Sequence, residues 1–146
     1  MKIVLGFDES AHAVAALRWI VRTQKPADTH VTIVSAVHVP VTAHAEAHMT
    51  TMPYPTERIE EVTRQHEELC QRAEATLKQA GFATSWKVLP GDPREALVES
   101  ARNEQADLLV VGSHGRSALL KLLLGSVALH VVSHAPCDVL VVKRTS

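Results

Sequence analysis

The fold of this chain is decided by a stretch from Asp107 to Val127, which reads DLLVVGSHGRSALLKLLLGSV. An apolar run, Leu108 to Val111, ends at Gly112, and Gly115 follows three residues later. After nine further residues a second corner, Gly125-Ser126, opens another apolar segment. This order predicts a buried strand, a glycine loop and the start of a helix.

The glycine loop has the chemistry of a phosphate-binding site. Glycine reaches positive φ at little steric cost and exposes backbone N–H groups, so Gly112 and Gly115 can surround an anion. Ser126 is a suitable N-cap for a helix that begins at Val127, and helix N-termini attract phosphate. Arg116 lies at the mouth of the loop, where its guanidinium can pair with phosphate oxygens. Spacing alone leaves an ordinary turn as an equal alternative, because this is neither a P-loop nor a Gly-x-Gly-x-x-Gly fingerprint.

Length and composition limit the kinds of protein this chain can be. With 146 residues, of which 46% are hydrophobic and 21% charged, it is expected to form one domain over residues 1–146. Lysine and arginine total 15 against 16 acidic residues, so neither nucleic acid nor an anionic membrane is an expected partner. No apolar run reaches the ~18 residues of a membrane span, and Met1-Lys2 leads directly into a strand-like run. The cytoplasm is therefore the expected location.

Short apolar runs alternate with helical patterns along the chain. The expected strands are residues 3–7, 30–37, 82–89, 107–111 and 138–142, and the expected helices begin near residues 10, 56, 93 and 127. This alternation predicts a parallel, doubly wound α/β sheet with helices on both faces. Asp8 follows the first strand at its carboxyl end, the edge where such sheets bind ligands. It is interpreted either as a residue that ends the strand or as a ligand contact.

The middle of the chain and the cysteines carry weaker signals. The stretch from Val39 to Pro55 contains three prolines and no clear period, and predicts a long loop or flap over the ligand edge. His44 and His48 lie four apart with a third histidine upstream, but no carboxylate or thiol completes a metal site, so solvated loop histidines are the favoured interpretation. Cys70 and Cys137 follow no metal or redox spacing; reduced thiols are expected, with an approach in space left open.

Three motifs in order resemble the universal stress protein family, specifically its ATP-binding branch. They are Gly112-x-x-Gly115 with Gly125-Ser126 nine residues later, the opening run Lys2-Ile-Val-Leu-Gly-Phe-Asp-Glu-Ser10, and the closing run Ala135-Pro-Cys-Asp-Val-Leu-Val-Val-Lys143. The resemblance covers nearly the whole chain except the variable middle. It implies the strand order 3-2-1-4-5, which would place the ends of the first and fourth strands side by side at the topological switch point.

The resemblance also implies an ATP site. Asp8 would face the ribose, and the backbone of Val37 would meet the adenine. The phosphates would be surrounded by Gly112, His114, Gly115, Arg116, Gly125, Ser126 and Val127. Magnesium would accompany the triphosphate through its oxygens, with few protein ligands. His114 is interpreted as a binding contact, because a catalytic acid or base needs an oriented partner. Valine at Gly112 or Gly125 is expected to weaken nucleotide binding without unfolding the chain.

The function predicted from these features is that of a nucleotide-dependent regulatory or sensor module in the stress response, with an unidentified protein partner. Slow ATP hydrolysis or phosphotransfer is an alternative, although no acidic residue can be assigned to position a water molecule at the phosphates. A dimeric interaction module with a vestigial pocket is another. The family commonly pairs its last strand across a two-fold axis, so residues 139–142 are expected to form the edge of a homodimer.

Overall fold

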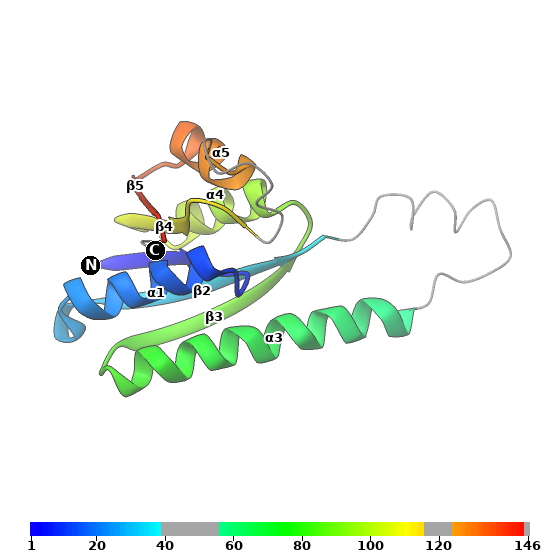
Figure 1. Cartoon of the computed structure of the whole chain (residues 1–146), viewed down its shortest axis with the longest axis horizontal. Coiled ribbons are helices and arrows are strands. Elements are labelled where there is room, and N and C mark those ends of the chain that lie inside the picture. The colour runs from blue at the N-terminus through cyan, green and yellow to red at the C-terminus, as the bar shows by residue number, and fades with distance from the viewer. Residues whose placement is uncertain (39–55, 116–123, 145–146) are drawn as a thin grey trace, which may run out of the picture.

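The chain folds as a five-stranded parallel sheet with helices on both faces in the computed structural model (Figure 1). The structure describes residues 1–38, 56–115 and 124–144. The strands are β1 (Lys2–Gly6), β2 (His30–Val37), β3 (Ala83–Pro90), β4 (Leu108–Gly112) and β5 (Asp138–Val142). Their order is β3-β2-β1-β4-β5, and every neighbouring pair is parallel. The predicted fold class and strand order are confirmed.

The helices lie where the sequence patterns predicted them. They are α1 (Ala11–Thr23), α3 (Thr56–Gln79), α4 (Pro93–Asn103) and α5 (Ser126–His134), with a 3-10 turn η1 (Pro26–Asp28) before β2. The side chain of Ser10 caps α1 by accepting from the N–H of Ala13. Gly125 is the N-cap of α5 and provides no side chain there, so Ser126 is the first helical residue and not the predicted cap. The glycine corner itself begins the helix.

Each face of the sheet has its own hydrophobic core. One face is covered by α1 and α3 and the other by α4 and α5 (Figure 1). Val110 belongs to the first core and its neighbour Leu109 to the second, because successive strand side chains point to opposite faces. This explains why the strands read as continuous apolar runs. Cys70 lies in the first core and Cys137 packs against the second, and both are free thiols.

The topology brings the ends of β1 and β4 together at one edge. β1 pairs with β2 on one side and with β4 on the other. The connection from β1 to β2 and the later connection to β4 therefore lead to opposite sides of β1, and the strand order reverses here. Beyond β4, the N–H of Ser113 donates to the carbonyl of Val142 at 2.8 Å. The predicted switch point is therefore confirmed, and the glycine loop starts there. Residues 39–55, for which a long loop or flap with His44 and His48 was predicted, and Arg116 lie outside the described residues.

Candidate functional site

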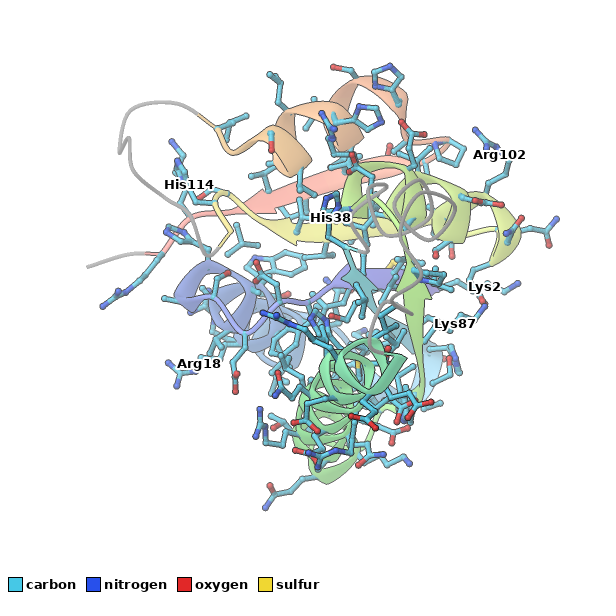
Figure 2. All side chains as sticks on the ribbon, turned by 90° about the vertical axis from the view of Figure 1, so that its right-hand side faces the viewer. Lys2, Arg18, His38, Lys87, Arg102 and His114 are labelled. Atoms are coloured by element: carbon cyan, nitrogen blue, oxygen red, sulfur yellow. The ribbon has the colours of Figure 1, made fainter. Side chains whose placement is uncertain are left out.

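A pocket of about 530 Å³ opens at the carboxyl edge of the sheet between the ends of β1 and β4. Its walls come from β1, β2, β4, α1, α3, α4 and α5. Its size lies in the range of small-molecule sites, ~300–1,000 Å³. Figure 2 shows two of its lining residues, His38 and His114, on the side of the molecule at which β2 ends. No described helix is long and apolar enough to cross a membrane.

Asp8 lies in the pocket beside the glycine loop. One carboxylate oxygen accepts from the N–H of Ser10 at 3.0 Å, and a Cβ placed on Gly115 would lie 3.0 Å from the other oxygen. Glu9, the next residue, has a φ of 64°, a left-handed conformation that costs free energy for a non-glycine residue. Its side chain pairs with Arg72 of α3 at 2.8 Å. The strained turn therefore holds Asp8 at the mouth of the loop.

Two of the three loop glycines, Gly112 and Gly125, lie close against backbone atoms. None of Gly112, Gly115 and Gly125 has a left-handed φ, so the expectation that glycine is needed here for positive φ was wrong. The expectation that glycine exposes backbone N–H groups to an anion stays a prediction. A Cβ on Gly112 would lie 2.6 Å from the backbone carbon of His12, and one on Gly125 would lie 3.2 Å from the carbonyl oxygen of Ser113. Because a side chain at Gly112 collides with the backbone of α1, valine there disturbs the fold as well as the loop. The expectation of a pure binding defect at this position is corrected.

The two glycine corners converge as predicted. The N–H of Gly125 donates to the carbonyl of Ser113 at 2.8 Å, and the hydroxyl of Ser10 donates to the carbonyl of His114 at 3.3 Å. His114, Gly115 and the first turn of α5 thus meet the end of β1. Of the predicted phosphate residues, Gly112, His114, Gly115 and Val127 line the pocket, whereas Gly125 and Ser126 lie beside it.

Val37 is the last residue of β2 and lies next to two residues that line the pocket. Its side chain is buried, and its carbonyl accepts from the N–H of Gly91 at 2.8 Å. Its neighbours Ala36 and His38 line the pocket, whereas Val37 does not. Contact between the backbone of Val37 and a base therefore stays a prediction.

Sequence reasoning missed the wall that α3 and α4 provide. Val62 and His66 of α3 line the pocket, and so does Leu97 of α4. The Nδ1 of His66 lies 2.8 Å from the hydroxyl of Ser35 in β2. In the sequence, His66 is a polar residue within the apolar stripe of α3, and that signal marks it as a candidate. Nothing local in the sequence shows that Leu97 reaches the pocket.

A second groove, lined by basic residues, runs along α1 from Ala11 to Arg22. It has a volume of about 710 Å³ and runs between α1 and the end of β5. Four basic residues, Arg18, Arg22, Lys143 and Arg144, line it, and none of the described residues along it is acidic. The backbone N–H of Arg144 lies 3.3 Å from Nδ1 of His12, next to the glycine loop. The chain has a net charge of −1, yet the described residues of this groove carry an excess of positive charge.

The sequence of this chain was compared with those of known protein families and proteins. The model of the universal stress protein family matches residues 1–143. The chain belongs to the universal stress protein family. It is 31% identical over 144 residues to universal stress protein MJ0531 of Methanocaldococcus jannaschii, an alignment that covers 98% of this chain and 82% of that protein. The predicted family is therefore confirmed.

Solved universal stress protein structures have the same fold. Hypothetical protein MJ0577, from the same archaeon, matches with a TM-score of 0.82 and 27% identity over 99% of this chain and 96% of that chain. A universal stress protein in complex with cAMP matches with a TM-score of 0.66 and 27% identity over 99% of this chain and 98% of that chain. The pocket described above therefore lies in a fold of which one solved member binds an adenine nucleotide.

Proposed function

We propose that this universal stress protein is a single-domain, cytoplasmic regulatory module that binds adenine nucleotides, with ATP and Mg²⁺ as the preferred ligand. The observation that carries the proposal is the Asp8 carboxylate, which lies against Gly115 at the mouth of a pocket of about 530 Å³. A carboxylate accepts hydrogen bonds from paired ribose hydroxyls, and backbone N–H groups of a glycine loop donate to phosphate oxygens. The pocket places these two kinds of group side by side.

In this proposal the ligand would lie along the length of the pocket. The adenine would lie near the backbone of Val37, against Ala36 and Val62, and the ribose at Asp8. The phosphates would face Gly112, His114, Gly115, Arg116, Gly125, Ser126 and Val127. Residues 1–38, 56–115 and 124–144 contain no group of three side chains able to hold a metal, so Mg²⁺ would be held mainly by phosphate oxygens. The related protein in complex with cAMP supports an adenine nucleotide as the ligand class.

Calorimetric titration of ATP with Mg²⁺ into nucleotide-free protein tests the proposal. Asp8→Asn keeps the oxygen that accepts from Ser10 but removes the charge, so we expect affinity to fall about tenfold. Asp28→Asn, which makes the same change in η1 outside the pocket, is the matched control and should bind like the wild type. A wild type that binds no ATP would refute the function, and equal affinities for all three proteins would refute the site.

We also propose that the protein forms a homodimer through β5. This strand is at the edge of the sheet, and residues 139–142 remain partly exposed. Leu129 and Val132 of α5, which packs beside β5, are 58% and 52% exposed. An uncovered edge strand next to exposed apolar side chains favours pairing with a second copy. Size-exclusion chromatography with light scattering should therefore report twice the mass of the chain.

A further inference from the structure

The cationic groove, the space of about 710 Å³ between α1 and the end of β5, carries positive charge that no described carboxylate balances. Its four basic residues are all exposed. Within residues 1–38, 56–115 and 124–144, none of them forms an ion pair. These residues are Arg18, Arg22, Lys143 and Arg144.

The composition of α1 explains why its arginines face solvent without a partner on their own helix. The helix reads AHAVAALRWIVRT and contains no acidic residue, so neither arginine has a carboxylate three or four positions away. On α3, by contrast, Arg64 pairs with Glu61 at 2.6 Å and with Glu68 at 2.8 Å. Figure 2 shows Arg18 at the outer surface of α1. A ligand can therefore reach both arginines without breaking an ion pair within α1.

The groove also has an apolar wall. Val14 and Trp19 of α1 and Val142 of β5 line it, and all three pack against the first hydrophobic core with part of their surface still accessible. A ligand with charged groups alone would leave this apolar surface in water, whereas a ligand that also has apolar groups would cover it and gain free energy. The groove therefore fits a ligand that is both acidic and apolar.

The dimensions of the groove suit a short stretch of extended polypeptide. From Ala11 to Arg22 the lining helix extends about 16 Å, the length of about five extended residues. Arg18 and Arg22 lie one helical turn apart, which is about 6 Å. Alternate residues of an extended chain repeat at about 7 Å. Acidic residues at every second position would thus match the spacing of the two arginines.

A nucleic acid is the other common polyanion, and the groove suits it less well. Proteins that bind single strands stack successive bases on several aromatic side chains. Among the described lining residues Trp19 is the one aromatic side chain, and aliphatic residues surround it. The chain as a whole has 16 acidic residues against 15 basic ones, so charge outside the groove does not attract a long polyanion.

The cationic groove is separate from the surfaces on which the proposed functions depend. It shares no described lining residue with the pocket at the ends of β1 and β4. It lies on the α1 face of the sheet, whereas the exposed Leu129 and Val132 belong to α5 on the opposite face (Figure 1). A ligand in the groove is therefore compatible with a bound nucleotide.

We propose that the cationic groove is the docking site for an extended acidic segment of a partner protein, in which acidic and apolar residues alternate. The acidic side chains pair with the exposed basic residues, and the apolar ones cover Val14, Trp19 and Val142. Peptides bound in this way are recognised by side chains at alternate positions. The inference does not depend on the proposed nucleotide site.

Fluorescence anisotropy with a defined peptide tests the proposal on the full chain. The probe is a fluorescein-labelled peptide of eight residues in which glutamate alternates with leucine. We expect binding that weakens at least tenfold when salt is raised from about 0.05 M to about 0.5 M. Two control peptides, with glutamine for every glutamate or serine for every leucine, should each bind at least fivefold more weakly.

Several outcomes of this titration would overturn the proposal. The first is no binding of the probe at protein concentrations up to about 1 mM. Equal affinity for either control peptide would show that charge or apolar contact plays no part. Tighter binding of an eight-nucleotide oligothymidylate than of the probe would assign the groove to nucleic acid.

A pair of double variants places the peptide in the groove. Arg18→Gln with Arg22→Gln removes two charges and keeps helix propensity, because glutamine and arginine are similar helix formers. Arg58→Gln with Arg102→Gln is the matched control, since it makes the same change at exposed positions of α3 and α4 outside the groove. An exposed ion pair changes affinity by a factor of about 1.5–5, so we expect about a tenfold loss in the first variant and less than twofold in the control. Equal affinities would refute the site, and thermal unfolding shows that both variants are folded.

Two further readouts distinguish the groove from other places and other occupants. Trp86→Phe leaves Trp19 as the single tryptophan, and its emission should shift to shorter wavelength when the peptide covers it. Unchanged emission at saturation would place the peptide elsewhere. Light scattering of Arg18→Gln with Arg22→Gln should give the wild-type mass, whereas a halved mass would show that a second copy of the chain occupies the groove and would overturn the proposal.

Discussion

Replacing Gly112 by alanine should destabilise the fold strongly. The added Cβ would lie 2.6 Å from the backbone carbon of His12, 2.7 Å from its Cβ and 2.8 Å from the N of Ala13. Carbon atoms in contact normally lie ~3.5–4.0 Å apart, so α1 and β4 must separate by about 1 Å. Two of the three atoms are backbone and cannot rotate away. We therefore expect a loss at the upper end of overpacking costs, about 3 kcal/mol.

Gly115→Ala is the matched control in the same loop. There the added Cβ meets only one carboxylate oxygen of Asp8, at 3.0 Å. That oxygen is the end of a side chain and can move by a few tenths of an ångström, so the cost to folding should stay below about 1 kcal/mol. Displacing the Asp8 carboxylate should nevertheless weaken ATP binding. The pair of variants separates a glycine needed by the fold from one needed by the site.

Urea unfolding at equilibrium, followed by the fluorescence of Trp19 and Trp86, measures both free energies of unfolding. A loss of about 3 kcal/mol in Gly112→Ala should also lower the melting temperature by about 6–12 °C. If Gly112→Ala unfolds within about 0.5 kcal/mol of the wild type, α1 can retreat from β4 freely and the packing argument is wrong. Equal losses in both variants would also refute it.

Three other predictions follow from single residues. Leu129→Glu, on the exposed face of α5, should halve the mass measured by light scattering; an unchanged mass would exclude this face from the dimer. Burial raises the pKa of Cys70 to about 11, so a thiol reagent should label Cys137 first, as mass spectrometry can show. Asp92→Ala should cost about 1 kcal/mol in urea unfolding near neutral pH. Since Arg94 holds the pKa of Asp92 at about 2, this difference should persist above about pH 4 and shrink as the pH falls towards 2.

The fold was predictable because local signals and burial agree. Residues 30–37 and 138–142 are strands with the predicted bounds, and apolar runs bounded by turn residues are strong signals in a parallel sheet. The predicted helix starts near residues 10 and 93 were equally clear, because the side chains of Ser10 and Asp92 cap these helices by accepting from a nearby N–H, which is a local interaction. The strand order needed the family resemblance, since crossover directions leave no local trace.

The site was only partly predictable because much of it depends on tertiary contacts. The meeting of Asp8 with Gly115 followed once the strand order was known. The strained φ of Glu9 and the contribution of Leu97 depend on how α3 and α4 pack over the strand ends. The cationic groove combines residues of α1 with the end of β5, more than a hundred positions later. The net charge of the whole chain does not reveal such a local cluster of basic residues.

The packing of α1 against β4 and the chemistry of the phosphate loop depend on the same contact. Gly112 allows the backbone of His12 to approach β4, and this approach brings the His12 imidazole within 3.0 Å of the Ser113 hydroxyl. A side chain at Gly112 would therefore separate the His12 imidazole from the Ser113 hydroxyl. Gly112 therefore matters for both the fold and the pocket, because any Cβ at this position would push α1 away from β4. By the same reasoning, we expect that Gly115, where an added Cβ would meet only a side chain, can be altered with little cost to the fold.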